Sequence, residues 1–276
     1  MDFQAIYDIA RHELTVTIRN RWTAIFAVVF AVLVTGIAYF GVMAEGYSGM
    51  QSFTRTSASL LNLVLYIVPL ISLTMGTLSL TGDKGSMELL FSQPVSRSEV
   101  VMGKILGLFF SIALSTLAGF AFAGMLVVLA HGTAGLARYA GLVGLSLLLS
   151  LSFLSIALLV ATANRRKPRA IGVALFLWFF FVIFYDLLAI SGALFLRGES
   201  ANMVLFLSLF GNPVDMVRVS TLIILENASI FGAAGAALLR FLGGGTLGFV
   251  VLMSALVVWI CAPVAFACRL LRRQDV

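Results

Sequence analysis

Carboxylates able to do chemistry inside an apolar environment are scarce in this chain. Only 11% of its 276 residues are charged, and Asp186 is the single carboxylate within a long apolar run. A carboxylate in such a place is a functional candidate by default. Counted from Ala170 at the helical rise, Asp186 lies roughly 24 Å along its run, near the far end. At that depth, contact with water or pairing with another helix explains a carboxylate more often than a substrate role.

Nucleophiles and metal ligands are spread thinly along the sequence. His12 and His131 stand at the ends of apolar runs, far apart in the chain and without neighbouring ligands. Cys261 and Cys268 are seven residues apart on one helix, too far for a mutual disulfide, and two thiols are too few for a metal site. Methionine thioethers can hold cuprous copper, although packing is their commoner use. Four methionines lie toward the predicted outer side of the membrane: Met43, Met50, Met203 and Met216.

Sequence motifs for catalysis are missing as well. The chain contains no P-loop, Walker motif, Gly-x-Ser-x-Gly or His-Glu-x-x-His. We therefore expect a non-catalytic protein that binds no metal and no cofactor of its own, and we see no pattern for nucleic-acid binding.

The composition is that of a membrane protein. The chain is 61% hydrophobic, whereas a soluble domain carries about a quarter of charged residues. Six apolar segments are each long enough to cross about 30 Å of hydrocarbon. We predict an all-α polytopic membrane protein with one transmembrane domain over 1–276, no cleavable signal peptide, and spans near 22–44, 57–81, 101–130, 139–163, 170–195 and 246–268.

The distribution of positive charge predicts the orientation of these spans. One set of connections holds most of the Lys and Arg residues, and the other holds only Arg55, Arg138, Arg197, Arg218 and Arg240. Because positively charged loops stay in the cytoplasm, both termini and the 82–100 loop are predicted to be cytoplasmic and 197–245 to lie outside.

Residues 2–20 precede the first span and form a separate predicted helix. Phe3, Ile6, Ile9 and Leu14 fall on one loose apolar stripe, with charged residues on the remainder. This pattern predicts an interfacial amphipathic helix that lies in the headgroup plane with its apolar face toward the lipid.

The loop from 82 to 100 has well-defined helix start and stop signals. Asp83 can cap a short helix, and Pro94 ends it because proline cannot continue a helix. Ser96 and Glu99 form a capping box that starts the next helix. These signals predict a short helix projecting into water between two spans.

The short helix in this loop is amphipathic. Met87, Leu90 and Phe91 share one side, and Lys84 and Glu88 can pair at i,i+4 elsewhere. On physical grounds alone, a solvated turn is the commoner interpretation of such a loop.

A family resemblance favours a more specific interpretation. The residues Asp83–Leu90, Pro94–Arg97 and Lys104 resemble the coupling loop of type-2 ABC-transporter permeases. The resemblance implies a homodimer in the bacterial inner membrane, with an elbow helix at 2–20 and a cytoplasmic ABC ATPase dimer that carries ATP and magnesium. It also implies that the ATPase is contacted by Asp83, Lys84, Met87, Glu88, Leu90, Phe91, Pro94 and Arg97.

Four stretches resemble one subgroup of this family more specifically. They are 10–22, the coupling loop, 178–187 and 212–218, and they are similar to permeases of the system that matures nitrous oxide reductase. That resemblance implies a role in assembling a copper–sulfur centre, with a periplasmic β-helix protein and a copper chaperone as further partners. The residues themselves predict nothing about copper or sulfur. Gly211 departs from the bulky residue that we expect before Asn212 in this subgroup.

The outside loop at 197–245 is longer than a simple connection needs. Asn212 can cap a helix that has Pro213 at its first position, which predicts two short helices at the outer surface or dipping into it. We expect an apolar face at Val214, Val217 and Leu222, rimmed by exposed charges at Asp215, Arg218 and Glu226.

Two roles fit such a loop. Other family members have short re-entrant helices here, which implies a lid over the dimer's exit. The length of the loop and its glycine run at 243–245 favour a dock for a periplasmic protein. The predicted docking residues are Asn212, Pro213, Asp215, Arg218 and Leu222.

The same residues fit other functions. A generic type-2 ABC exporter with another substrate has the same features, and so does a subunit that only relays motion to an outside partner. A secondary transporter or channel would need midplane charges or broken helices, which the sequence does not clearly offer. An intramembrane enzyme would need a catalytic constellation that is missing. The cargo and its direction are not predicted.

Overall fold

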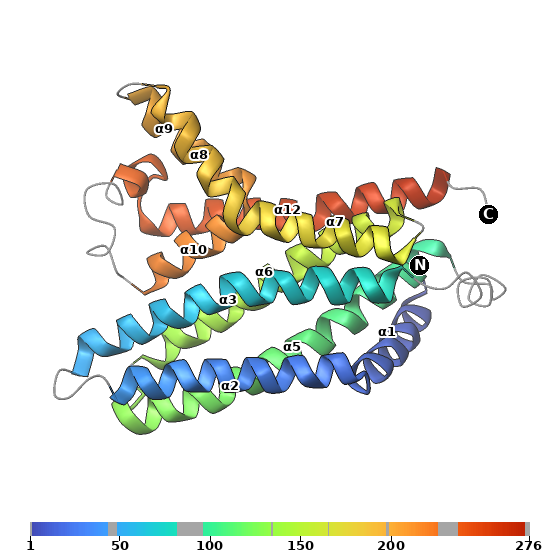
Figure 1. Ribbon diagram of the computed structural model, residues 1–276, viewed down its shortest axis with the longest axis horizontal. Coiled ribbons are helices and arrows are strands. Elements are labelled where there is room, and N and C mark those ends of the chain that lie inside the picture. Colours follow the sequence, from blue (N-terminus) through green and yellow to red (C-terminus); the bar gives the residue numbers. More distant parts are fainter. Residues whose placement is uncertain are drawn as a thin grey trace.

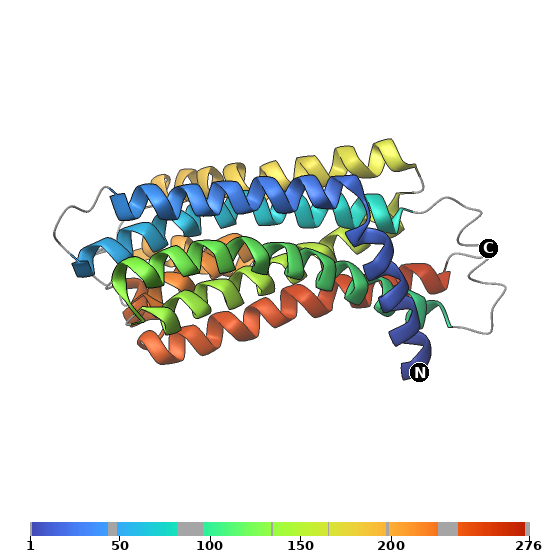
Figure 2. The same cartoon turned by 90° about the horizontal axis from the view of Figure 1, so that it is seen from below.

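The computed structural model describes residues 2–43, 49–81, 96–133, 135–164, 166–196, 199–225 and 237–273. Within these ranges the chain is helical and contains no strand. Its helices run side by side in an elongated bundle (Figures 1 and 2). The prediction of an all-α polytopic membrane protein is confirmed.

Six helices of the described chain are long and apolar enough to cross a membrane. The fifth continues from α7 (Lys167–Phe179) through a π-helical turn, η1 (Phe180–Phe184), into α8 (Tyr185–Leu194). The other five are α2 (Arg21–Met43), α3 (Gly49–Leu80), α5 (Arg97–His131), α6 (Leu136–Ala163) and α12 (Gly245–Arg273).

The bundle is centred on α6, which packs mainly against α3 and α12. Two thirds of its most apolar stretch (67%) is buried, against 22% in α2 and 17% in α12. Its small polar residues allow this close packing. The hydroxyls of Ser72 in α3 and Ser150 in α6 are 3.0 Å apart, and Ser146 and Ser155 donate to carbonyls of their own helix. The Ser72–Ser150 contact therefore joins α3 to α6, while the other two hydroxyls are satisfied within α6 and let its small residues stay buried.

The first helix, α1 (Phe3–Ile18), crosses α5 at the end of the bundle where α3 ends and α5 begins (Figure 2). Gly103 and Gly107 of α5 allow the close approach. A Cβ atom at Gly103 would lie 2.7 Å from Ile9 Cβ, and one at Gly107 would lie 2.7 Å from Glu13 Cβ. Two glycines four residues apart are a common means of bringing membrane helices together. We call this the junction end of the bundle.

The predicted placement of α1 needs a correction. Its apolar stripe was expected to face lipid as a whole, but part of it packs on α5. The Ile9 side chain lies against Gly103, while Phe3 of the same stripe is 83% exposed. The α5 glycines draw part of the stripe inward, an effect that the α1 sequence alone does not reveal.

At the opposite end, two short helices meet at a sharp bend. They are α9 (Glu199–Ser208), which leads into the 3₁₀ turn η2 (Leu209–Gly211), and α10 (Pro213–Ile224). The bend between them is 103°. α10 dips into the bundle and contacts α6, α12 and α3, whereas α8 and α9 pair with each other and lean away from it (Figure 1). We call this the corner end. The predicted pair of short helices is confirmed, with the second beginning at the Asn212 cap.

Replacing Gly107 by alanine should destabilise the protein by about 1–3 kcal/mol, because the added methyl group enters a filled contact with α1. Thermal unfolding of the purified protein measures this change. The matched control is Gly144→Ala in α6, where the space is open and alanine should be neutral or stabilising by about 0.5–1 kcal/mol. Equal effects of the two substitutions would contradict the α1–α5 contact.

Candidate functional site

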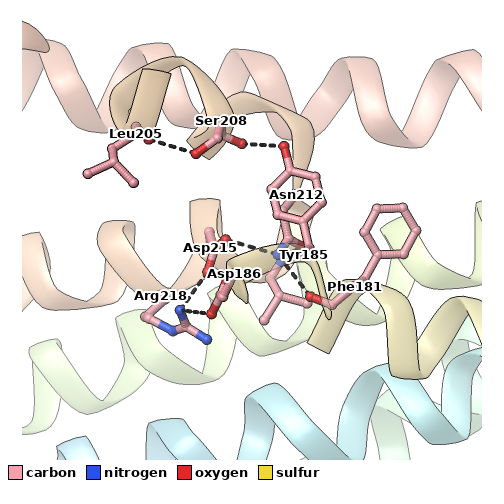
Figure 3. A network of polar contacts seen from close by, with 9 residues as sticks. Phe181, Tyr185, Asp186, Leu205, Ser208, Asn212, Asp215 and Arg218 are labelled. Atoms are coloured by element: carbon pink, nitrogen blue, oxygen red, sulfur yellow. Dashed lines mark hydrogen bonds and ion pairs between the residues drawn. The ribbon is translucent and has the colours of Figure 1, made fainter. Parts of the chain in front are cut away.

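The corner end contains a cluster of polar side chains from α8 and α10. We call Tyr185, Asp186, Asn212, Asp215 and Arg218 the corner cluster (Figure 3). Arg218 Nη1 donates to Asp186 Oδ2 at 3.0 Å and to Asp215 Oδ1 at 2.6 Å. One guanidinium therefore holds two carboxylates, and it joins α8 to α10. The prediction that Asp186 is paired with another helix is confirmed.

Asn212 organises the start of α10. Its Oδ1 atom accepts from the Val214 backbone N–H at 3.0 Å, which is the predicted N-cap. Its Nδ2 atom donates to Asp215 Oδ2 and to the Phe181 carbonyl, each at 2.9 Å. Phe181 lies in the π turn of the fifth span. One side chain thus caps α10, orients Asp215 and fixes α10 to the widened turn.

Two further side chains satisfy the carbonyls at the bend. Tyr185 Oη donates to the Ser208 carbonyl at 2.7 Å, and Trp259 Nε1 of α12 donates to the Phe210 carbonyl at 3.0 Å. Helix-end carbonyls that are buried away from water need such donors, because an unpaired buried polar group is costly.

Gly211 is explained by the same contact. A Cβ atom at this position would collide with the Tyr185 hydroxyl. The glycine therefore gives Tyr185 the space to reach the bend. The sequence alone does not show that these two residues are in contact.

The predicted exposure of this region was wrong. Asp215 and Arg218 are engaged inside the corner cluster, with 14% and 32% of their side chains exposed. Val214 and Val217 lie in the hydrophobic core. α10 is apolar enough to be buried between other helices. In the sequence of a membrane protein, a helix face that packs in the core has the same apolar pattern as a face that binds a partner.

The remaining docking residues follow the same pattern. Pro213 is buried, and Leu222 packs against the core. Glu226 lies outside the described residues. A docking role for this loop stays a prediction.

The junction end has a second group of polar residues, which sequence reasoning did not assemble. We call Glu13, Ser79 and Lys104 the junction cluster. The Glu13 carboxylate is buried, accepts a hydrogen bond from the Ser79 hydroxyl, and lies 3.7 Å from Lys104 Nζ. These residues come from α1, α3 and α5. The sequence feature that could have indicated this cluster is Glu13 itself, a single glutamate close to the apolar stripe of an amphipathic helix.

Glu99 adds a second link at the junction end. It forms the predicted capping box with Ser96. Its Oε2 atom accepts from the Ser96 backbone N–H at 2.9 Å, and its Oε1 atom accepts from the Asp2 backbone N–H at 2.8 Å. The first turn of α5 therefore also holds the start of α1.

Most of the predicted ATPase-coupling residues lie outside the described ranges, and their assignment stays a prediction: Asp83, Lys84, Met87, Glu88, Leu90, Phe91 and Pro94. Arg97 is the first residue of α5. What the structure describes is the frame of the loop. The end of α3 and the start of α5 are both bound to α1 through the contacts above.

No three His, Cys, Asp or Glu side chains gather in the described part of the chain. Cys261 and Cys268 are both free thiols.

A family model and two similar proteins all identify the same class of protein, ABC transporter permeases. Residues 7–276 match the model of a family described as ABC-2 family transporter protein. A probable ABC transporter permease protein NosY from Pseudomonas aeruginosa is 34% identical over 98% of this chain and 99% of its own length. Another protein of the same name from Stutzerimonas stutzeri is 32% identical over 93% of this chain and 91% of its own length.

Replacing Arg218 by glutamine should lower the free energy of unfolding by about 2 kcal/mol, because Asp186 and Asp215 lose their shared cation. The loss is smaller than at a fully buried pair, since 32% of the Arg218 side chain is exposed. Thermal unfolding in detergent measures it, and Arg240→Gln at an exposed position is the control.

The double variant Asp186→Arg with Arg218→Asp keeps one cation between two carboxylates. It should recover part of the stability that either single change removes. Failure of any recovery would show that the cluster does not act through charge pairing.

Proposed function

Because this chain belongs to the ABC-2 transporter family as a permease, we propose that it passes ATP-driven motion from a cytoplasmic ATPase to the far side of the membrane. The ATPase would bind the 82–100 loop, which runs from the end of α3 into the first turn of α5. The observation that carries this proposal is the frame of that loop. α1, the end of α3 and the start of α5 are joined by the junction cluster and by Glu99.

The joined helices favour a lever over a flexible connection. A displacement of a loop is not transmitted to the helices when the two ends of the loop can move independently. Here Ser79 lies just before the loop and Lys104 shortly after it, and both contact the Glu13 side chain of α1. The buried Glu13 carboxylate opposes separation of α1 from α3 and α5, because losing Ser79 or Lys104 would leave its charge incompletely compensated. Displacement of the loop would therefore move three helices together.

Partners and cofactors follow from the family. We propose that two copies of the chain pair with an ATPase dimer that carries ATP and magnesium, and that this chain has no catalytic residue and no cofactor of its own. Both termini would lie in the cytoplasm, and the protein would reside in the bacterial inner membrane. The excess of Lys and Arg at the junction end supports this orientation.

The proposed biological role is maturation of the copper–sulfur site of nitrous oxide reductase. Two relatives at 34% and 32% identity carry the name NosY, and four stretches of the sequence resemble that subgroup. A periplasmic β-helix protein and a copper chaperone would then be partners at the corner end. Transport of another substrate by the same type of permease is the alternative.

The corner end has two candidate roles: a dock for the periplasmic protein, or a lid over the exit of the dimer. A lid role is favoured by one observation: Arg218 is already paired with two carboxylates of its own chain. Internally paired charges hold the bend in one position, and they are less available to a partner than the exposed charges that docking was expected to use.

Replacing Leu90 by aspartate should release the ATPase while the permease still inserts into the membrane. An unpaired charge at a buried contact costs about 2–5 kcal/mol, which is at least a tenfold loss of affinity. Copurification of the ATPase with a tagged permease measures the loss. Ser92→Asp places the same charge in the same loop, off the predicted apolar side, and should retain the ATPase. Undiminished copurification from Leu90→Asp would refute the coupling assignment.

The orientation is tested by cysteine labelling in intact cells. In a chain with Cys261 and Cys268 replaced by alanine, Lys167→Cys should be protected from a membrane-impermeant maleimide, and Ser200→Cys should react. Permeabilised cells, in which both positions should react, are the control. Reaction of both positions from the same side of intact membranes would contradict the six-span topology.

A further inference from the structure

The fifth span changes its hydrogen-bond pattern at the π turn η1, and Tyr185 and Asp186 of the corner cluster follow directly after this turn. The Tyr185 backbone N–H donates to the Phe180 carbonyl, five residues back. In an α-helix the same N–H would donate to Phe181, four residues back. A π turn therefore contains one residue more than an α-helical turn, and such turns are frequent at functional sites.

The Phe181 carbonyl, which the Tyr185 N–H would bind in an α-helix, accepts from a side chain at the start of α10. Asn212 Nδ2 donates to it at 2.9 Å (Figure 3). Asn212 is buried, and a buried carbonyl without a donor is costly. Removing the Asn212 amide would therefore favour the α-helical pattern, in which the Tyr185 N–H satisfies the same carbonyl. The π turn thus depends on a residue from another helix.

The register of this turn determines which residue of α8 faces Arg218. In the α-helical pattern, α8 would rotate by about 100° and advance by about 1.5 Å, the increments of one residue. Tyr185 would then occupy the present place of Asp186, and Asp186 would occupy the present place of Leu187, which is 55% exposed. The ion pair between Asp186 and Arg218, which is 3.0 Å long in the structure, would be broken.

The two helices after the turn lie largely outside the bundle. α8 and α9, which we call the arm, pack mainly against each other and against the turns η1 and η2, and they lean away from the other helices (Figure 1). Two side-chain hydrogen bonds join the start of α8 to its neighbours: Tyr185 donates to the Ser208 carbonyl, and Arg218 donates to Asp186. Both involve the first two residues after η1, so a change of register there would break both bonds together.

We propose that η1 is a register switch, that Asn212 holds it in the π form, and that release of Asn212 from the Phe181 carbonyl rotates the arm. In the π form, Asp186 and Asp215 share Arg218, and the arm is tied to α10. In the α-helical form, Arg218 keeps Asp215 alone, and Asp186 moves to the exposed side of α8.

The switch is coupled to the position of α10. Asn212 caps this helix through the Val214 N–H, so displacement of α10 from the fifth span withdraws the residue that holds the π turn. The corner end therefore has two states that differ in the orientation of the arm and in the partners of Arg218. This inference rests on the fold of the corner end and is independent of the proposed contact with the ATPase.

Pulsed EPR across the turn tests the switch. Nitroxides are attached at Leu175→Cys in α7 and Leu188→Cys in α8, both exposed, in the full-length chain with Cys261 and Cys268 replaced by alanine. Labelled protein is diluted with unlabelled protein, so that distances within one chain are measured. Asn212→Ser keeps a side chain that can cap α10 but lacks the amide donor. It should shift the distance by several ångströms, because α8 turns by about 100°.

Deletion of Ile183 distinguishes a change of register from a general loss of structure. The deletion removes the extra residue of the turn, so an α-helical turn then gives α8 its present orientation. In the Asn212→Ser chain it should restore the original distance. In the otherwise unaltered chain it should leave the distance unchanged, a result that does not depend on the folding of the serine variant.

The matched control is Trp259→Phe, which removes the donor to the Phe210 carbonyl at the same bend and should leave the distance unchanged. The proposal is overturned if Asn212→Ser gives the distance of the unsubstituted chain, or if deletion of Ile183 does not restore that distance in the serine variant. A shift of several ångströms on deleting Ile183 alone would also overturn it, because η1 would then not contain one extra residue.

Discussion

Buried backbone polar groups must be satisfied within the protein, and this constraint determines the architecture of the corner end. The bend before Pro213 exposes carbonyls that water would otherwise bind. Tyr185 and Trp259 donate to two of them, and Asn212 caps the next helix while it binds the π turn. These contacts come from three helices, so the broken helix is held in place by the bundle and also ties the bundle together. The conformation of α10 is therefore a property of the whole fold.

Buried charge obeys the same rule at both ends of the molecule. Glu13 is compensated by Ser79 and Lys104, and Arg218 is compensated by Asp186 and Asp215. Such pairs contribute little net stability compared with an apolar contact, but breaking one is costly, so they fix the relative positions of helices. Three helices are fixed around the loop that would meet the ATPase, and two at the corner. Between them, the serine contacts of α6 and α3 allow continuous close packing.

Sequence reasoning succeeded where the determinants are local. Apolar length predicted the spans, and the Asn212 cap and the Ser96–Glu99 capping box were read directly from residue order. It failed where the determinant is a distant residue. Pairing of Asp186 with another helix was expected, but its partner Arg218, 32 positions away, was not. The contact of α1 with Gly107 likewise depends on a helix far along the chain. The burial of α10 was missed because an apolar face in a membrane protein has the same pattern whether it meets a partner, lipid or its own core.

We expect α1 and the ends of α3 and α5 at the junction end to move as one body when the ATPase acts. Pulsed EPR between nitroxides at Tyr7→Cys in α1 and Leu78→Cys in α3 measures this directly, in complexes that contain one labelled copy. The distance should be the same without nucleotide and with vanadate-trapped nucleotide, while the distance from Leu78→Cys to Leu188→Cys in α8 changes. A change in the Tyr7–Leu78 distance as large as the change in the Leu78–Leu188 distance would show that α1 and α3 move independently.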